Sequence, residues 1–379
     1  MTNALLRLEK IDKFYGQIGS GVHAVRNVSM NVQGGEIVAF LGSSGCGKTS
    51  TLRMIAGFEE TSRGRIIIND REVQTLAPAK RNVAMAFEGY SLYPTVTVRD
   101  NITFALKAAR LRDEEVKKRV GEVAQMLEID DIMEKYPTSI SGGQQQRASL
   151  GRALVRDADL HLLDEPMGQL EPQLRTLLRG RIKHYIKQRG LTAILVTHDQ
   201  TEANALADNI AVMEDGVLQQ FASPETIKER PANLFTGTFV GEPPMNVFPA
   251  SAAEADGKIR LTLNEHTQLV YRSDAFDQAV RTTLRSQKSV VLGIRPYSVR
   301  RGETNKHERA TATVAVCQWL GDQTHIAADF AGGTIVLVEH DRADLSVGDT
   351  IQISLDPNQL HFFDAESGQA IRHGGARIP

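Results

Sequence analysis

The sequence GSSGCGKT at residues 42–49 decides the fold of the first part of this chain. It fits the pattern G-x-x-x-x-G-K-[ST], in which glycines let the backbone wrap closely around phosphate. A helix that begins directly after such a loop adds a dipole that favours an anion. We therefore expect Lys48 to reach the β- and γ-phosphates of a nucleotide and the Thr49 hydroxyl to bind Mg²⁺. The residues of this stretch expected to bind the nucleotide are Gly42, Ser43, Gly45, Cys46, Gly47, Lys48, Thr49 and Ser50.

The segments around this loop have the pattern of an α/β domain. An apolar run at 36–42 predicts a buried strand before the loop, and residues 49–58 predict a helix after it. Further buried strands are predicted at 159–166 and 191–199, and apolar residues recur at helical spacing in 114–129. Strands that alternate with helices favour a largely parallel sheet.

Two acidic residues follow one of these strands. In LHLLDEP, at 160–166, Asp164 ends the apolar run and Glu165 comes next. A carboxylate in this place can hold Mg²⁺, and its neighbour can polarise the water that attacks the γ-phosphate. A strand that ends in a solvated acidic turn is the plainer alternative, but the phosphate loop favours the functional interpretation.

Three more motifs give the chain a specific resemblance. ISGGQQQR at 140–147 matches the signature of ATP-binding cassette (ABC) ATPases, VTHDQTEA at 196–203 resembles their switch-histidine segment, and KFYG at 13–16 resembles their adenine-stacking loop. All five motifs occur in the order of that family over roughly residues 5–240. The site residues that the resemblance adds are Tyr15, His198, Ser141, Gly142, Gly143 and Gln144.

The resemblance implies a two-chain mechanism with ATP and Mg²⁺. Two ATPase domains would sandwich two ATP molecules, so that the phosphate loop of one chain meets the signature of the other. This chain has one of each, so it needs a second ATPase subunit, either the same chain or a paralogue. Glu165 would be the general base, Lys48 and His198 would contact the γ-phosphate, and opening and closing of the sandwich would move transmembrane subunits.

The pattern changes after about residue 240, where short alternating segments predict a small all-β domain of barrel type. FVGEPPMN at 239–246, LGIRP at 292–296 and QWLGDQT at 318–324 resemble the C-terminal extension of ATPase subunits of carbohydrate importers. The expected fold is an α/β ABC ATPase domain with a helical subdomain over 1–240, followed by an OB-like β-barrel regulatory domain over 241–379.

Two positions depart from the family pattern near the nucleotide. Glu88, in FEGYSLYP, replaces a glutamine that normally touches Mg²⁺ and the attacking water, and Glu171 replaces an aspartate. Glu88 can still ligate Mg²⁺, but it adds a negative charge, so we expect a slower or differently coupled site. The departures also leave open a heterodimer in which this chain is a partly degenerate ATPase. Cys46, at a helix N-terminus, is expected to favour the thiolate.

Composition narrows the class of protein. The chain has 379 residues, a net charge of −2 and two cysteines, which argues against a nucleic-acid binder and against a disulfide framework. A soluble ABC ATPase that acts on DNA or the ribosome is the alternative. It is disfavoured because Ser141 follows Thr49 by only 92 positions, which leaves no room for a long coiled coil, and because the chain has one phosphate loop.

The resemblance also implies partners and a place in the cell. The expected partners are two transmembrane permease subunits, an extracytoplasmic solute-binding protein and a regulatory protein at the C-terminal domain. No apolar run is long enough to span a bilayer, so we expect a peripheral subunit on the cytoplasmic face of the membrane. The solute would be a sugar, a polyol, glycerol or glycerol phosphate.

Overall fold

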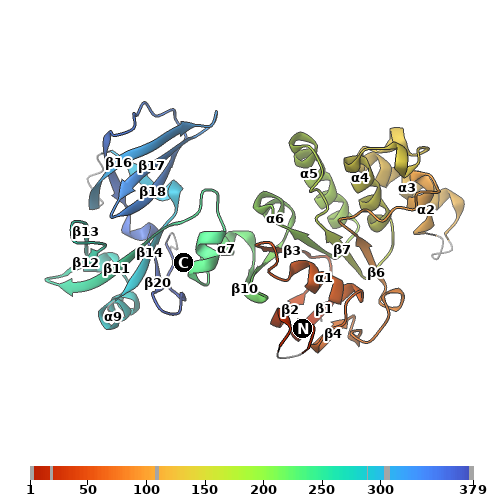
Figure 1. Ribbon diagram of the computed structural model, residues 1–379, viewed down its shortest axis with the longest axis horizontal. Helices are drawn as coiled ribbons and strands as arrows, with labels where there is room; N and C mark the ends of the chain where they lie inside the picture. Colours follow the sequence, from red (N-terminus) through yellow and green to blue (C-terminus); the bar gives the residue numbers. More distant parts are fainter. Residues whose placement is uncertain (1–3, 18–19, 107–110, 288, 303–307, 375–379) are drawn as a thin grey trace. The chain divides into compact units, whose positions relative to one another are not determined.

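The computed structural model describes residues 4–17, 20–106, 111–287, 289–302 and 308–374. The chain divides into two compact units, Met1–Pro224 and Glu225–Pro379, and many of their strands and helices are labelled in Figure 1. The boundary expected from the sequence was residue 240. The segment between residue 224 and that position belongs to the second unit.

A six-stranded sheet carries the predicted apolar runs of the first unit. Three of its strands, β3, β8 and β7, are buried at every residue, as expected for a parallel sheet covered on both faces. All neighbouring strands are parallel except the edge pair β10–β9. In spatial order the strands are β10 (Val217–Ala222), β9 (Asn209–Glu214), β3 (Ile37–Gly42), β8 (Ala193–Thr197), β7 (Leu160–Asp164) and β6 (Val83–Ala86).

A second, antiparallel sheet shares a core with the first. Its strands, in spatial order, are β2 (Val22–Val32), β1 (Leu6–Tyr15), β4 (Arg63–Ile68) and β5 (Arg71–Glu72). Helix α1 (Lys48–Ala56) contributes Leu52 and Ile55 to a buried cluster that also holds Leu8 of β1 and Phe40 of β3. This packing fixes the helix that follows the phosphate loop against both sheets.

The remaining helices of the first unit come from segments between the sheet strands. Figure 1 shows α2, α3 and α4 grouped together beyond the sheet, as the predicted helical subdomain requires. In α3, Val120, Val123 and Leu127 are buried on one face, which confirms the periodicity of the sequence. The helices are α2 (Val98–Phe104), α3 (Asp113–Leu127), α4 (Gly142–Leu154), α5 (Pro172–Gln188) and α6 (Gln200–Leu206). Among the described residues, no helix is long and apolar enough to cross a membrane.

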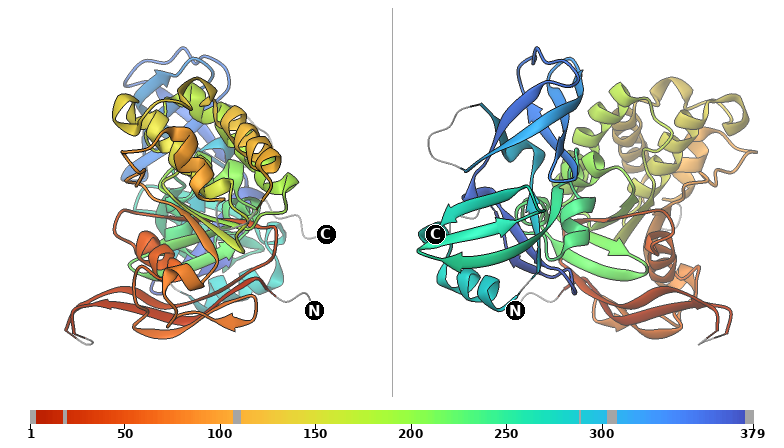
Figure 2. Two further views of the ribbon diagram at one scale, coloured as in Figure 1. Left: turned by 90° about the vertical axis from the view of Figure 1, so that its right-hand side faces the viewer. Right: turned by 60° about the vertical axis from the view of Figure 1, so that its left-hand side comes forward.

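The second unit consists mainly of two antiparallel sheets, both visible in the right-hand view of Figure 2. The first sheet has, in order, β13 (Gln268–Arg272), β12 (Lys258–Thr262), β11 (Asn246–Ala255), β14 (Val290–Ile294), β20 (His361–Asp364) and β21 (Ala370–Arg372). The second has β15 (Val299–Arg301), β19 (Thr350–Leu355), β16 (Glu308–Trp319), β17 (Thr324–Phe330) and β18 (Gly333–Glu339). The α/β fold followed by an antiparallel β domain confirms the predicted fold class.

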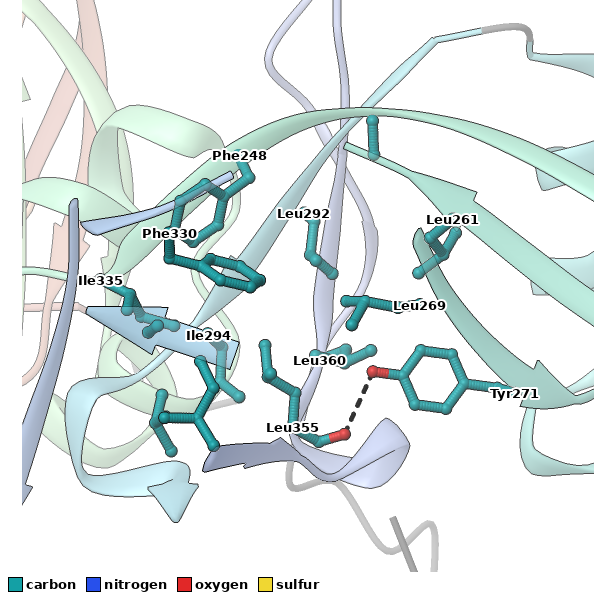
Figure 3. Packing of buried hydrophobic residues seen from close by; sticks show 14 of the residues in the cluster. Phe248, Leu261, Leu269, Tyr271, Leu292, Ile294, Phe330, Ile335, Leu355 and Leu360 are labelled. Carbon is teal, nitrogen blue, oxygen red and sulfur yellow. Dashed lines mark hydrogen bonds between the residues drawn. The ribbon is translucent and has the colours of Figure 1, made fainter. Parts of the chain in front are cut away.

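One apolar cluster joins the two sheets of this unit (Figure 3). Phe248 and Phe330 meet edge to face with ring centroids 5.2 Å apart. The Tyr271 hydroxyl donates a hydrogen bond of 3.1 Å to the Leu355 carbonyl, which satisfies the one polar atom of that buried ring. The cluster also receives Val280 and Leu284 from α9 (Gln278–Ser286), a helix that the strand pattern of the sequence did not predict.

Arg295 ties two helices to this β domain. Its guanidinium donates to the carbonyls of Gly237 and Val240, at the end of α8 (Leu234–Phe239), and to that of Lys228 in α7 (Pro224–Glu229). Burial lowers the pKa of Arg295 to about 10. When a guanidinium that donates hydrogen bonds to several carbonyls is removed, those acceptors are left without a donor.

We therefore predict that Arg295→Met lowers the free energy of unfolding of the second unit by about 2–3 kcal/mol, because the carbonyls lose their donor. The control is Arg301→Met, which removes a partly exposed ion pair with Glu339. It should lower the free energy of unfolding by less than about 1 kcal/mol. Trp319 is the only tryptophan of the chain and lies in β16, so urea unfolding followed by its fluorescence measures this unit. Equal losses in the two variants would contradict the prediction.

Candidate nucleotide-binding site

The loop at 42–49 joins the end of β3 to the start of α1. Gly45 and Gly47 have φ of 81° and 99°, which glycine adopts without strain. A Cβ on Gly42 would lie 2.3 Å from the Met213 carbonyl oxygen, and one on Gly47 would lie 2.4 Å from that of Ala24. The loop therefore needs glycine at both positions. It leads into the N-terminus of α1, a place where a bound anion is favoured.

Lys48 is held inside this loop. Its ammonium donates hydrogen bonds of 2.8 Å to the carbonyls of Gly42 and Ser43. The Cys46 sulfur lies 3.7 Å away and is buried, and that burial raises the pKa of the thiol despite the charge of Lys48. The expectation that the helix terminus favours a Cys46 thiolate is therefore wrong, because the side chain points into the core and loses its water.

Thr49 and Asp164 bring two oxygen ligands together. The Thr49 hydroxyl donates to the Asp164 carboxylate over 3.3 Å. Burial raises the pKa of Asp164, and the charges of Glu88 and Glu165 raise it further. Hard oxygen donors in a buried, negatively charged setting fit Mg²⁺, because the cation would compensate the cost of burying the carboxylate.

Glu165 and His198 are adjacent although they lie 33 positions apart in sequence. Glu165 follows β7 with φ of 47°, and its backbone N–H donates to the Val196 carbonyl of β8. The His198 Nδ1 atom lies 3.0 Å from the Glu165 carboxylate. The His198 side chain is 73% exposed, so its ring remains accessible to a ligand.

Lys48, Thr49, Glu165 and His198 line one pocket of about 390 Å³, and Asp164 contacts it through Thr49. The residues that line it are Ser44, Gly45, Gly47, Lys48, Thr49, Ser50, Glu88, Gln146, Glu165, Gly168, Gln169 and His198. The exposed Glu88 thus lies on the same cavity as the phosphate loop and the proposed base.

Tyr15 lies beside the end of the phosphate loop. Its hydroxyl is 2.9 Å from the Ser50 Oγ atom, and the Lys13 ammonium lies 4.9 Å from the centre of its ring. Burial raises the pKa of the Tyr15 hydroxyl, yet the residue is 41% exposed. The position next to Ser50 is compatible with a base that stacks on the ring.

The four signature residues form the N-terminus of α4. The Ser141 hydroxyl accepts from the Gln144 backbone N–H, and the Gln144 side chain accepts from the Ser141 backbone N–H. This capping box holds Gly142 and Gly143 in the first turn. None of the four is among the described residues that line the pocket, so within one chain the structure does not bring them to the phosphate loop.

Gln146, one turn further along α4, is a pocket residue that the sequence analysis missed. Its amide donates to the Glu165 carbonyl over 2.8 Å and accepts from the Gln169 backbone N–H over 3.0 Å. Gly168 and Gln169 also line the pocket and were missed as site residues. Their closeness to Glu165 in sequence was a usable signal, whereas the role of Gln146 depends on how α4 packs.

Comparisons with known proteins agree with this geometry. The family model described as ABC transporter matches residues 25–168, and the one described as TOBE domain matches residues 292–363. The oligosaccharides import ATP-binding protein MsmX of Bacillus subtilis is 38% identical over 97% of this chain and 100% of its own length. The trehalose/maltose import ATP-binding protein MalK of Thermococcus litoralis is 38% identical over 97% of this chain and 99% of its own.

Two further comparisons give the same assignment. The xylose/arabinose import ATP-binding protein XacK of Haloferax volcanii is 36% identical over 98% of this chain and 96% of its own. A dimeric ATP-binding cassette solved in a post-hydrolysis state with ADP and Pi matches with a TM-score of 0.53 and 26% identity, over 58% of this chain and 98% of that chain. The chain therefore belongs to the import ATP-binding proteins of the ABC transporter family, as an ATPase that uses ATP and Mg²⁺ and carries a C-terminal TOBE domain.

Proposed function

We propose that the pocket around the phosphate loop is the site of ATP hydrolysis and that Lys48, Glu165 and His198 carry out the reaction. The observation that carries this proposal is the 3.0 Å contact between His198 and Glu165 on the same cavity as Lys48. A base, a histidine and a cation around one cavity suit phosphoryl transfer to water.

In the proposed reaction, the Glu165 carboxylate removes a proton from water as the water oxygen bonds to the γ-phosphorus. The bond from that phosphorus to the bridging oxygen of ADP breaks, and phosphate leaves. Lys48 and the backbone N–H groups of residues 43–50 stabilise the charge on the phosphates, and His198 keeps Glu165 and the water in line. Mg²⁺, held by Thr49 and Asp164 with Glu88 beside them, would supply further positive charge to the phosphate oxygens.

The signature residues Ser141, Gly142, Gly143 and Gln144 are proposed to complete the site of a second ATPase subunit. They stand at a helix N-terminus, where the backbone N–H groups of Gly142 and Gly143 and the Ser141 hydroxyl suit a γ-phosphate. Ser141 and Gly142 are exposed and do not line the pocket of their own chain. Tyr15 is proposed to stack on adenine, with Ser50 beside it.

The names of the relatives support a proposal for the solute and the remaining partners. Proteins named for the import of oligosaccharides, trehalose or maltose, and xylose or arabinose are similar to this chain over nearly its whole length. We propose that this chain binds two permease subunits at the cytoplasmic face of the membrane and powers uptake of a sugar. A solute-binding protein delivers the sugar to the permease subunits. The C-terminal domain is proposed as the place where a regulatory protein binds. The relatives do not favour the alternative of a DNA- or ribosome-associated ATPase.

Glu165→Gln should lower the kcat of ATP hydrolysis by about 10²–10⁴-fold, because an amide cannot take the proton from water. The affinity for MgATP should change little, since the phosphate loop is intact. Phosphate release and nucleotide binding by the full chain measure the two quantities. Glu114→Gln, on the exposed first turn of α3, is the matched control. Wild-type turnover by Glu165→Gln would remove this residue from the mechanism.

Glu88→Gln should raise the kcat of hydrolysis, because it removes a carboxylate that opposes negative charge at the γ-phosphate and raises the pKa of Asp164. A relief of about 1 kcal/mol corresponds to roughly fivefold in rate. Glu88→Asp keeps the charge and should not accelerate the reaction. An unchanged rate together with unchanged transport would contradict this prediction.

Affinity purification of the tagged full chain from solubilised native membranes should recover two permease subunits and a second ATPase subunit. The mass of the intact complex distinguishes two copies of this chain from one copy with a paralogue, and thus decides whether Glu88 and Glu171 occur in both sites. Recovery of soluble partners alone would overturn the importer assignment of this chain.

A further inference from the structure

Arg175 joins two loops of the proposed site. It lies in the first turns of α5, and its Nη2 atom donates to the carbonyls of Gly168 and Leu170, over 3.4 and 3.2 Å. Its Nη1 atom donates to the Asp199 carboxylate over 3.1 Å. One guanidinium therefore contacts both the segment that follows Glu165 and the segment that contains His198.

The His198 segment is anchored on its other side as well. The Asp199 carboxylate caps α6 by accepting from the Glu202 backbone N–H over 3.0 Å. The Thr197 hydroxyl accepts from the Asp199 backbone N–H over 3.0 Å and donates to the Glu202 carboxylate over 2.6 Å. Thr197 and Glu202 are 0% and 2% exposed, so His198 projects to the pocket from a backbone that is fixed on both sides.

The charges around Arg175 favour a cation at this place. Burial opposes the ionised form of Asp199, but hydrogen bonds from the Glu202 backbone N–H and from Arg175 lower the pKa of its carboxyl. Burial, together with the charges of Asp199 and Glu165, raises the pKa of Glu202 to about 7, although the Thr197 hydrogen bond and the charge of Arg175 oppose this rise. Arg175 thus pairs directly with Asp199, and the charge of Arg179 also favours the ionised form of that carboxyl.

We propose that Arg175 is a positioning residue for ATP hydrolysis, because it fixes the 167–170 segment and the His198 segment at a set distance from one another. The proposal rests on the proposed roles of Glu165 and His198. Both segments contribute to the pocket, through Gly168 and Gln169 on one side and His198 on the other. The planar guanidinium bonds the two carbonyls through one nitrogen and the carboxylate through the other, a fixed spacing that a lysine ammonium does not reproduce.

The test compares three variants of the full chain by kcat, KM for MgATP and thermal unfolding. Arg175→Met should lower kcat by about tenfold or more while KM changes less than about threefold, because the geometry of the reacting groups is lost and nucleotide binding is not. Arg175→Lys keeps the charge without the fork, and it should recover only part of kcat. Arg181→Met is the control, since that arginine lies in the same helix and pairs with Glu128.

A double-mutant cycle separates positioning from a structural role. Because Arg175 acts through His198, adding Arg175→Met to His198→Ala should cost much less than it costs in the wild-type chain. Three results would each overturn the proposal. The losses in kcat of the two single variants could multiply in the double variant, Arg175→Lys could keep full activity, or folded Arg175→Met could have the same kcat as Arg181→Met. If Arg175→Met does not fold, Asp199→Asn replaces it under the same criteria.

The same measurements distinguish this inference from the proposed function. If Glu165→Gln and His198→Ala keep wild-type turnover, the proposed site itself is wrong. If both lose turnover and Arg175→Met in the folded chain does not, the site stands and the positioning role of Arg175 is rejected.

Discussion

The close contact between the phosphate loop and its neighbouring backbone is the constraint on which the site depends. Gly42 and Gly47 leave no room for a Cβ, because the carbonyls of Met213 and Ala24 occupy that space. The tight turn that results starts α1 at Lys48 and directs the Thr49 hydroxyl at Asp164. Packing of α1 against both sheets then prevents the loop from relaxing.

Charge is the second organising factor of the first unit. Glu165 and Glu88 line the pocket, Asp164 contacts the pocket residue Thr49, and Asp199 and Glu202 lie at the start of α6, next to His198. Lys48 lies on the pocket and Arg175 pairs with Asp199, and a bound Mg²⁺ would add positive charge beside Asp164. These carboxylates would favour a bound cation, and Glu88 adds a negative charge where the family resemblance leads us to expect a glutamine.

In the second unit, the main structural feature is the attachment of two helices, α7 and α8, to a β domain. A single apolar cluster joins its two sheets, and Arg295 fixes α7 and α8 by hydrogen bonds to their carbonyls. The motif LGIRP at 292–296, which marked the resemblance to importer subunits, contains this arginine. The motif LGIRP therefore includes a residue, Arg295, whose hydrogen bonds hold helices of the second unit in place.

The sequence alone determined the phosphate loop, the order of strands and helices around it and the β character of the C-terminal part. These are local properties, because glycine spacing, apolar periodicity and turn residues act over a few positions of the chain. The tertiary structure decided the burial of Cys46, the place of Gln146 in the pocket and the bridge that Arg175 forms between two loops. No local pattern reports these features, because each depends on which distant segments the packing of sheets and helices brings within hydrogen-bond distance.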